Sequence, residues 1–145
     1  MRVLVQRTAK ASVSIDNKIY NEIDNGIVVL VGFTEGDDIS KIEYLVKKIV
    51  NLRIFPDEEN IMNKSILEYG GEVLSISQFT LYADTSKGNR PSYIKALKSE
   101  QSTKLYDLFN KELEKYVTVK TGVFGEDMIV NINNVGPTTI ILERW

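Results

Sequence analysis

A continuous apolar run at residues 26–33, GIVVLVGF, constrains the fold more than any other part of the sequence. The run has no polar face, and it is shorter than a typical surface helix. Glycine opens the run and returns near its end, which sets its bounds. Such a pattern is typical of a strand that is buried on both faces. We therefore expect residues 26–33 to form a strand at the centre of a sheet.

The chain before this run also predicts β structure. Apolar and polar residues alternate over residues 3–7, and the segments ASVSID and KIYNEI flank a turn-forming DNK, which indicates a hairpin. Further strands are expected at residues 73–83, 128–132 and 138–142, the last two joined by a turn at residues 133–137.

A first helix is predicted over residues 39–50, where apolar residues recur at steps of three and four. Asp37 and Asp38 stand directly before it. An acidic pair can hold a metal, but acidic side chains also accept hydrogen bonds from the free N–H groups of a first helical turn. We favour capping over metal binding.

A second helix is expected from about Ser99 to Tyr116, with Ser99 as its N-cap. Its predicted apolar stripe, a core face rather than a cofactor site, consists of Leu105, Leu108, Phe109 and Leu113. Strands punctuated by two separated helices predict an α+β fold, with mainly antiparallel sheets packed in a barrel-like core and two covering helices.

The composition limits the size and location of the protein. A chain of 145 residues with 43% hydrophobic and 26% charged residues predicts one globular domain over residues 1–145. No apolar run approaches the roughly 18 residues that a membrane helix needs. The first residues alternate as a strand does, without a leader pattern, so we expect a cytoplasmic protein with no membrane partner.

The chain contains no cysteine and no histidine. Thiolate nucleophiles, disulfides and cysteine-ligated zinc are therefore excluded, together with the commonest general base and the imidazole metal ligand. The formal net charge of −2 gives no overall attraction to nucleic acid. A nucleic-acid partner would need a local basic patch.

The segment SQFTLYAD, residues 77–84, turns polar at the end of an apolar run. Strand alternation places Gln78 and Thr80 on the face of Leu74 and Ile76, toward the interior or a cleft beyond it. Polar side chains at such positions commonly bond to neighbouring backbone, so this pattern alone leaves a structural role as the default.

The segment NNVGPTT, residues 133–139, predicts a rigid turn. Gly136 has no side chain and Pro137 has no N–H, so the turn can present its carbonyl oxygens to a ligand. A plain hairpin turn is the alternative. The sequence itself does not decide whether the bond between the two residues is cis or trans.

Together these segments resemble a known family. Ser77-Gln78-Phe79-Thr80-Leu81 and Asn134-x-Gly136-Pro137-x-Thr139 are similar to the paired signatures of the D-aminoacyl-tRNA deacylases. The segments VLVQRTAKASV, LRIFPDEENIMN, NRPSY and TGVFGEDM resemble family segments in the same order. A related family that acts on L-alanine mischarging has a trans Gly-Pro turn and a different strand motif, and Ser77-Gln78-Phe79 favours the D-specific branch.

The resemblance implies a homodimer without a cofactor or metal. The Gly-Pro turn of one subunit, held cis, would reach the other subunit's site and exclude an L side chain, while a D-aminoacyl ester or glycine on tRNA could enter. The catalytic segment would be Gln78, Phe79 and Thr80, and the substrate-binding surface and chiral gate would be Ser77, Gly136, Pro137 and Arg7, with Arg7 fixing the turn.

Two accounts of catalysis remain open at the level of sequence. Thr80 would be a nucleophile, but a hydroxyl needs a neighbouring base, and the chain has no histidine. Alternatively, the vicinal ribose hydroxyl of the terminal adenosine activates a water while backbone N–H groups around Phe79 and Thr80 stabilise the oxyanion. We favour the second account.

A basic run follows the predicted site strand. Between residues 85 and 99 there is no Asp or Glu, and the cations are Lys87, Arg90, Lys95 and Lys98. Such a run is often only a solvated surface, but its position favours contact with the phosphates of the tRNA acceptor end. The leading hypothesis is therefore a D-aminoacyl-tRNA deacylase, and the alternatives are a non-catalytic tRNA- or nucleotide-binding module on the same fold and a structural dimerisation module.

Overall fold

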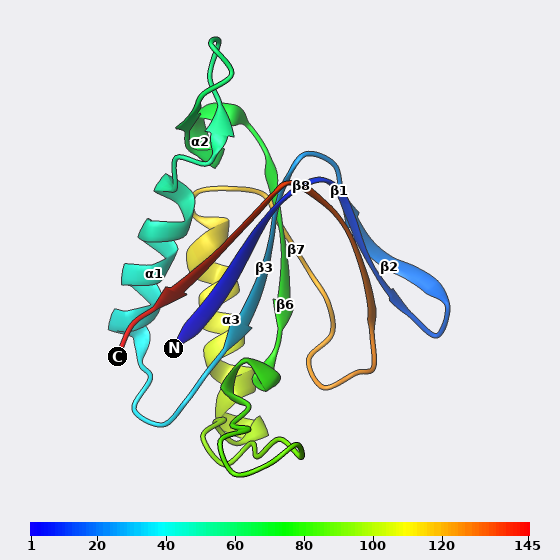
Figure 1. The fold of residues 1–145 in the computed structure, drawn as a ribbon, viewed down its shortest axis with the longest axis vertical. Helices are drawn as coiled ribbons and strands as arrows, with labels where there is room; N and C mark the ends of the chain where they lie inside the picture. Colours follow the sequence, from blue (N-terminus) through cyan, green and yellow to red (C-terminus); the bar gives the residue numbers. More distant parts are fainter.

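The computed structural model describes residues 1–145, and a mixed six-stranded sheet forms the body of the protein (Figure 1). The strands of the sheet are hydrogen-bonded in the order β2-β1-β3-β6-β7, and β8 pairs with β1. Their bounds are β1 (Arg2–Ile15), β2 (Lys18–Ile23), β3 (Gly26–Gly32), β6 (Glu72–Ser77), β7 (Val119–Thr121) and β8 (Ile129–Glu143). The other elements are α1 (Ile39–Asn51), the hairpin β4 (Phe55–Pro56) and β5 (Met62–Lys64), α2 (Ile66–Tyr69), the 3-10 helix η1 (Phe79–Tyr82) and α3 (Ser99–Glu114).

The apolar run at residues 26–33 forms β3, the central strand of the sheet order, as predicted. Every residue of β3 except Leu30 is buried. The strand pairs antiparallel with β1 on one side and parallel with β6 on the other, and β6 pairs parallel with β7. The candidate site described below is attached to the end of this buried pair.

The sheet curls on itself because β1 is long enough to change partners. Its first half pairs with β3 and its second half with β2, while β8 runs along its whole other edge. The side chain of Asn21 donates to the Thr121 carbonyl oxygen at 2.6 Å, and Lys120 Nζ donates to the Glu22 carbonyl oxygen at 2.9 Å, so β2 meets β7. The predicted α+β fold with a barrel-like sheet is confirmed.

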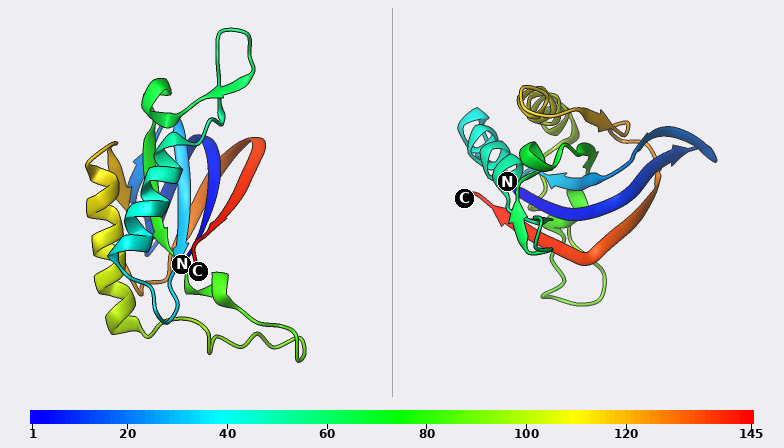
Figure 2. Two further views of the ribbon diagram at one scale, coloured as in Figure 1. Left: turned by 90° about the vertical axis from the view of Figure 1, so that its left-hand side faces the viewer. Right: turned by 90° about the horizontal axis from the view of Figure 1, so that it is seen from above.

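Helices α1 and α3 lie together on one face of the sheet (Figure 2), where the larger apolar core is formed. Asp38 caps α1 by accepting a hydrogen bond from the Lys41 N–H at 3.1 Å, so the capping interpretation holds for this residue. Asp37 does not cap the helix but binds the N-terminus and the preceding loop. Its carboxylate accepts from the Met1 ammonium at 2.7 Å and from the Thr34 N–H at 2.8 Å.

The boundaries predicted for the second helix were partly wrong. Lys98 is the N-cap of α3 and has no capping side-chain bond, while Ser99 is already the first helical residue. The helix ends at Glu114. Leu108 is 39% exposed, and the buried positions of the helix are Ser102, Tyr106, Phe109, Asn110 and Leu113. Polar residues thus occupy part of the face that the apolar stripe was expected to fill.

The two C-terminal strands are one continuous strand, β8, instead of a hairpin. Its pairing with β1 is irregular around Thr8, and residues 135–138 bulge out between the pairs Gln6–Thr139 and Thr8–Asn134. A bulge accommodates the Gly-Pro sequence without reversing the chain. No helix of the protein is long and apolar enough to cross a membrane.

Candidate active site

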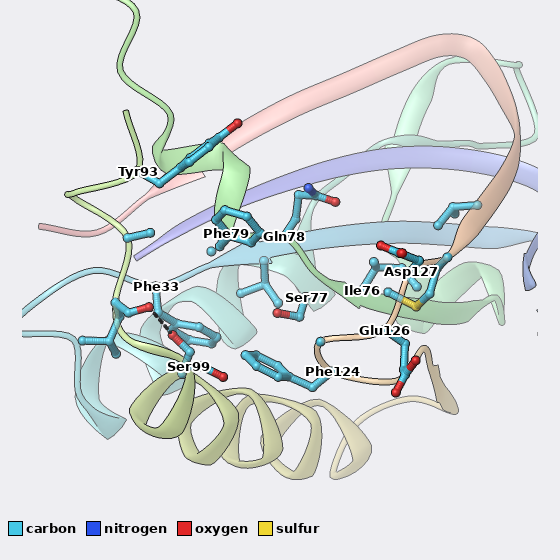
Figure 3. A pocket seen from close by; sticks show the side chains of 18 residues that line it. Phe33, Ile76, Ser77, Gln78, Phe79, Tyr93, Ser99, Phe124, Glu126 and Asp127 are labelled. Atoms are coloured by element: carbon cyan, nitrogen blue, oxygen red, sulfur yellow. Dashed lines mark hydrogen bonds between the residues drawn. The ribbon is translucent and has the colours of Figure 1, made fainter. Parts of the chain in front are cut away.

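A cavity of about 580 Å³ lies where β6 ends, between η1, the start of α3 and the loop before β8 (Figure 3). Ser77, Gln78 and Phe79 line one side of it, and Phe124, Glu126 and Asp127 line another. Apolar side chains and a few polar groups converge here, which is typical of a small-molecule site. The cavity contains much of the segment that the sequence singled out.

The strand expected over residues 73–83 stops at Ser77, and this corrects the predicted side-chain directions. Gln78 has φ −144° and ψ 84°, and the chain then turns into η1. Alternation therefore does not extend to Gln78 and Thr80, which are half-buried, whereas Phe79 is 54% exposed. The turn places Gln78 and Phe79 on the cavity wall.

The position of this turn is fixed by β3. The Gln78 N–H donates to the Val31 carbonyl oxygen at 2.7 Å. A Cβ at Gly32 would lie 2.9 Å from the Gln78 carbonyl oxygen, so glycine is needed for this close approach. The buried strand thus holds the start of the polar segment directly.

Two backbone donors are free at the start of η1. The first backbone bond of the turn runs from the Leu81 N–H to the Gln78 carbonyl oxygen at 3.3 Å, and neither Phe79 nor Thr80 donates its N–H to another group of the chain. The Gln78 side-chain amide donates to the Thr80 hydroxyl oxygen. An amide is not a base, so Thr80 has no proton acceptor suited to making it a nucleophile.

The loop before β8 is anchored under the cavity by a buried bond. The Tyr106 hydroxyl donates to the Ser75 carbonyl oxygen at 2.7 Å, and the Gly122 N–H donates to the same oxygen at 3.2 Å. The ring of Phe124 packs on that of Tyr106 with 6.0 Å between centroids. Burial of the Tyr106 hydroxyl raises its pKa, so it stays a donor at neutral pH.

Sequence reasoning missed the acidic side of the cavity and its aromatic mouth. Glu126, Asp127, Phe124 and Tyr93 all line the cavity, but they stand far along the chain from residues 77–80. The sequence pointed to these four residues only through the segments TGVFGEDM and NRPSY, which resemble family segments. No group of three or more acidic residues is placed to hold a metal ion.

The Gly136–Pro137 peptide bond is cis, as the resemblance implies. Gly136 has φ 112°, a backbone conformation that favours glycine, and a Cβ there would lie 2.6 Å from the Thr138 hydroxyl oxygen and 3.0 Å from Nη2 of Arg7. The Asn134 side chain donates to the carbonyl oxygens of Arg7 and Thr138, both at 2.9 Å. The turn is therefore held at both ends.

Within one chain the Gly-Pro turn and the cavity lie at opposite ends of β3. Val31 pairs with Ser77 at one end, and Ile27 pairs with Arg7, opposite the bulge, at the other. Four strand residues separate these levels, roughly 13 Å at about 3.3 Å per residue. The structure brings Ser77, Gln78 and Phe79 together in one place and Arg7, Gly136 and Pro137 together in another.

The basic run lies on the exposed loop beside the cavity. Lys87, Arg90 and Lys98 are exposed and form no ion pair within the chain. Lys95 pairs with Asp84 at 2.9 Å. Hydrogen bonds from Ser86, together with Lys95, hold the pKa of Asp84 well below its usual range, so this pair is formed at neutral pH. Lys95 is thus engaged in an ion pair, whereas Lys87, Arg90 and Lys98 face solvent.

A family model described as D-Tyr-tRNA(Tyr) deacylase matches residues 4–143. A relative from Bacteroides thetaiotaomicron, named D-aminoacyl-tRNA deacylase, is 54% identical over 145 residues, which cover 99% of this chain and 97% of the relative. The chain belongs to the D-aminoacyl-tRNA deacylase family. It is an enzyme of the D-aminoacyl-tRNA deacylase type.

Two solved structures have the fold of this chain. A structure described as c-Myc DNA Unwinding Element Binding Protein is 39% identical, with a TM-score of 0.94 and 99% of both chains covered. A structure described as a probable eukaryotic D-amino acid tRNA deacylase is 17% identical, with a TM-score of 0.83 and 97% of both chains covered, and it shows the same fold. The deacylase fold is therefore retained at low sequence identity.

Proposed function

We propose that this enzyme hydrolyses the ester bond of D-aminoacyl-tRNA in the cytoplasm and releases the free D-amino acid and tRNA, as a chiral proofreading step in translation. Glycine mischarged on tRNA is a further substrate, because it has no side chain for the gate to exclude. The observation that carries the proposal is the 54% identity to a D-aminoacyl-tRNA deacylase over nearly the full length of both chains.

The free backbone donors indicate how the reaction proceeds. The N–H groups of Phe79 and Thr80 have no partner in the chain, so they are available to the oxyanion that forms on the ester carbonyl. The vicinal ribose hydroxyl of the terminal adenosine activates a water. Water adds to the carbonyl carbon, the bond from this carbon to the ribose oxygen breaks, and the ribose oxygen takes a proton.

Thr80 and Gln78 then act as positioning groups. The Thr80 hydroxyl accepts a hydrogen bond from the Gln78 amide, which orients it without making it more nucleophilic. Ser77 lines the cavity beside Gln78 and contacts the substrate. This assignment agrees with a chain that contains no histidine and no cysteine.

The chiral gate requires a second subunit. The Gly136–Pro137 turn lies too far from the cavity of its own chain to touch a substrate there, so a homodimer supplies the turn across the subunit interface. The carbonyl oxygens of the turn contact the substrate's amino group and leave no room for an L side chain. The exposed apolar residues of β8, Ile129, Val135 and Ile141, support an interface on this strand.

The tRNA acceptor end approaches along the basic run. Lys87, Arg90 and Lys98 provide unpaired positive charge beside the cavity, and Lys95 adds to it when its pair with Asp84 opens. Contacts with phosphates position the RNA and make binding depend on salt. The protein as a whole is acidic, so these contacts stay local.

The decisive assay compares D-Tyr-tRNA with L-Tyr-tRNA and Gly-tRNA. We expect rapid hydrolysis of the D and glycyl esters and little of the L ester, and equal rates for the D and L esters would refute the proposal. A second candidate is a non-catalytic nucleic-acid-binding module, because the 39% identical structure is named for binding DNA. That candidate predicts tRNA binding with an unchanged half-life of every ester.

A further inference from the structure

The Gly-Pro turn is continuous with an exposed apolar patch on the β4–β5 hairpin. Thr138 Oγ1 lies 3.9 Å from Sδ of Met62, and it is the first atom that a Cβ on Gly136 would meet, so Thr138 bridges the two residues. Ile61 and Met62 are each 55% exposed, and Val135 is 40% exposed. The turn and the hairpin therefore present one continuous exposed surface.

The hairpin is also tied to the turn through Arg7. Nη1 of Arg7 donates to the Ile54 carbonyl oxygen, directly before β4, at 2.6 Å, and Nε donates to the Val135 carbonyl oxygen at 3.3 Å. The base of the hairpin and the start of the turn are therefore bonded to the same guanidinium. Figure 1 shows the hairpin and the bend of β8 at the same end of the sheet, away from the loop that follows η1.

A second apolar patch surrounds the mouth of the cavity at the other end. The rings of Phe79 and Tyr93 are edge to face with 5.0 Å between centroids. Their exposed fractions are 54% and 41%, and that of Ile94 is 92%. Aromatic rings left this open at the mouth of a site indicate a surface that another apolar group covers.

The tip of the hairpin is acidic and the loop beside the mouth is basic, while Glu126 and Asp127 lie on another wall of the cavity. The tip of the hairpin carries Asp57, Glu58 and Glu59, of which Glu58 pairs with Lys64. The loop beside the mouth carries the unpaired cations Lys87, Arg90 and Lys98. In a two-fold symmetric dimer, the first patch of each subunit can lie on the second patch of its partner, so the same contact forms twice. A second copy of this chain therefore matches both patches in polarity and in charge.

We propose that the β4–β5 hairpin of each subunit docks on one rim of the other subunit's cavity, with Met62 against Phe79 and Tyr93 of the partner subunit, and leaves the rest of the mouth open to the substrate. This inference rests on the homodimer of the proposed function. A flexible thioether fits the edges of aromatic rings well. The hairpin is then the element that seats the Gly136–Pro137 turn at the correct depth.

Cysteine crosslinking tests this contact directly, because the chain has no native cysteine. Met62→Cys and Tyr93→Cys are combined in one chain and the purified protein is oxidised. The two positions lie at opposite ends of the sheet in one chain, so a disulfide forms only between subunits. We expect most of the protein to become a covalent dimer on denaturing gels, and neither single variant to do so.

Two further pairs of cysteine substitutions are needed to interpret the crosslinking of the 62/93 pair. Val135→Cys with Tyr93→Cys reports on the Gly-Pro turn itself, and Ile19→Cys with Tyr93→Cys is the control, because Ile19 lies on the β1–β2 hairpin, outside both apolar patches, and is 63% exposed. Ile94→Cys replaces Tyr93→Cys in each pair if the tyrosine variant is unstable. Sedimentation and D-Tyr-tRNA hydrolysis are measured on the unmodified chain.

The outcomes are separable. Crosslinking of the 62/93 pair, with none in the 19/93 control, supports the docked hairpin. Crosslinking of the 135/93 pair alone, or equal crosslinking of the 19/93 control, overturns the docked hairpin and leaves the proposed function standing. A monomer that does not crosslink overturns the docked hairpin and the shared site together, while its hydrolysis of D-Tyr-tRNA decides the activity independently.

Discussion

Nε of Arg7 donates a hydrogen bond to the carbonyl oxygen of Val135 at 3.3 Å, immediately before the Gly136–Pro137 turn. Its Nη1 donates to the Ile54 carbonyl oxygen at 2.6 Å. One side chain on β1 thus holds the turn and the base of the hairpin with charged donors. Such bonds are stronger than those between neutral groups and harder to replace by another side chain.

Arg7→Gln is expected to loosen the turn while the fold persists. A hydrogen bond to a charged group contributes about 1.5–3 kcal/mol, which corresponds to a decrease of about 10- to 100-fold in kcat/KM for D-Tyr-tRNA. The ratio of D to L hydrolysis should fall as well. Single-turnover rates on both esters measure this, with Arg144→Gln as an exposed control. Unchanged selectivity in Arg7→Gln would show that the turn does not depend on this residue.

Thr80→Ala separates the two accounts of catalysis. If the ribose hydroxyl of the substrate activates water, the variant keeps its rate within about tenfold, because one positioning bond contributes about 0.5–1.5 kcal/mol. A tRNA ending in 2′-deoxyadenosine should instead lose activity by orders of magnitude with the wild-type enzyme. The reverse pattern, with Thr80→Ala inactive and the deoxy substrate hydrolysed, would make Thr80 the nucleophile.

Gly136→Ala should close the gate. The added methyl group meets Thr138 and the Arg7 guanidinium, and φ 112° is unfavourable for alanine. We expect a loss of activity of about 100-fold or more on D-Tyr-tRNA and a cost in stability of about 1–3 kcal/mol. Gly36→Ala is the matched control, since Gly36 has φ 79° but open space around its Cα. Wild-type rates in Gly136→Ala would contradict a steric gate.

The free energy of unfolding should fall in alkali because of Tyr82, the buried tyrosine at the end of η1. Burial, and then the nearby charge of Asp37, raise the pKa of Tyr82 from 10.0 to about 12. The folded state therefore favours the neutral phenol. The stabilisation is fully present below pH 10 and is lost as the pH rises toward about 12.

Urea unfolding at pH 8, 10 and 11.5 measures this dependence. Tyr82→Phe should flatten the alkaline decrease, and Tyr20→Phe is the control because Tyr20 is 52% exposed. A decrease of the same size in both variants would assign the effect to other groups.

The sequence predicted those elements whose pattern is carried by apolar residues. The run at residues 26–33 and the helical period of α1 are repeated over many positions, so burial alone determines them. The end of β6 was missed because Gln78 leaves the strand through its own backbone angles and a bond to Val31, and side-chain alternation carries no sign of either. The helix α3 begins at Ser99 as expected, but its N-cap was misplaced by one residue because Lys98 caps through its backbone only.

The candidate site was predictable only in part for a related reason. Residues 77–80 stand next to one another and signal a site by their change in polarity, and NNVGPTT signals a special turn by its glycine and proline. Phe124, Glu126 and Asp127 reach the cavity through tertiary packing on Tyr106, a relation between distant parts of the chain. The bulge that keeps β8 continuous likewise depends on β1, so a local pattern could not distinguish it from a hairpin turn.

The placement of the cavity and the Gly-Pro turn at opposite ends of β3 has a genetic consequence under the proposed pairing. Each chain carries one half of two different catalytic centres, so a lesion in the turn of one chain and a lesion in the cavity of its partner fall in the same centre. Co-expressing the two defective alleles should therefore restore one intact centre per mixed dimer, whereas placing both lesions on one chain damages both centres of its dimer with a wild-type chain. Complementation between alleles therefore follows from the length of β3, which separates the Gly-Pro turn from the cavity of the same chain.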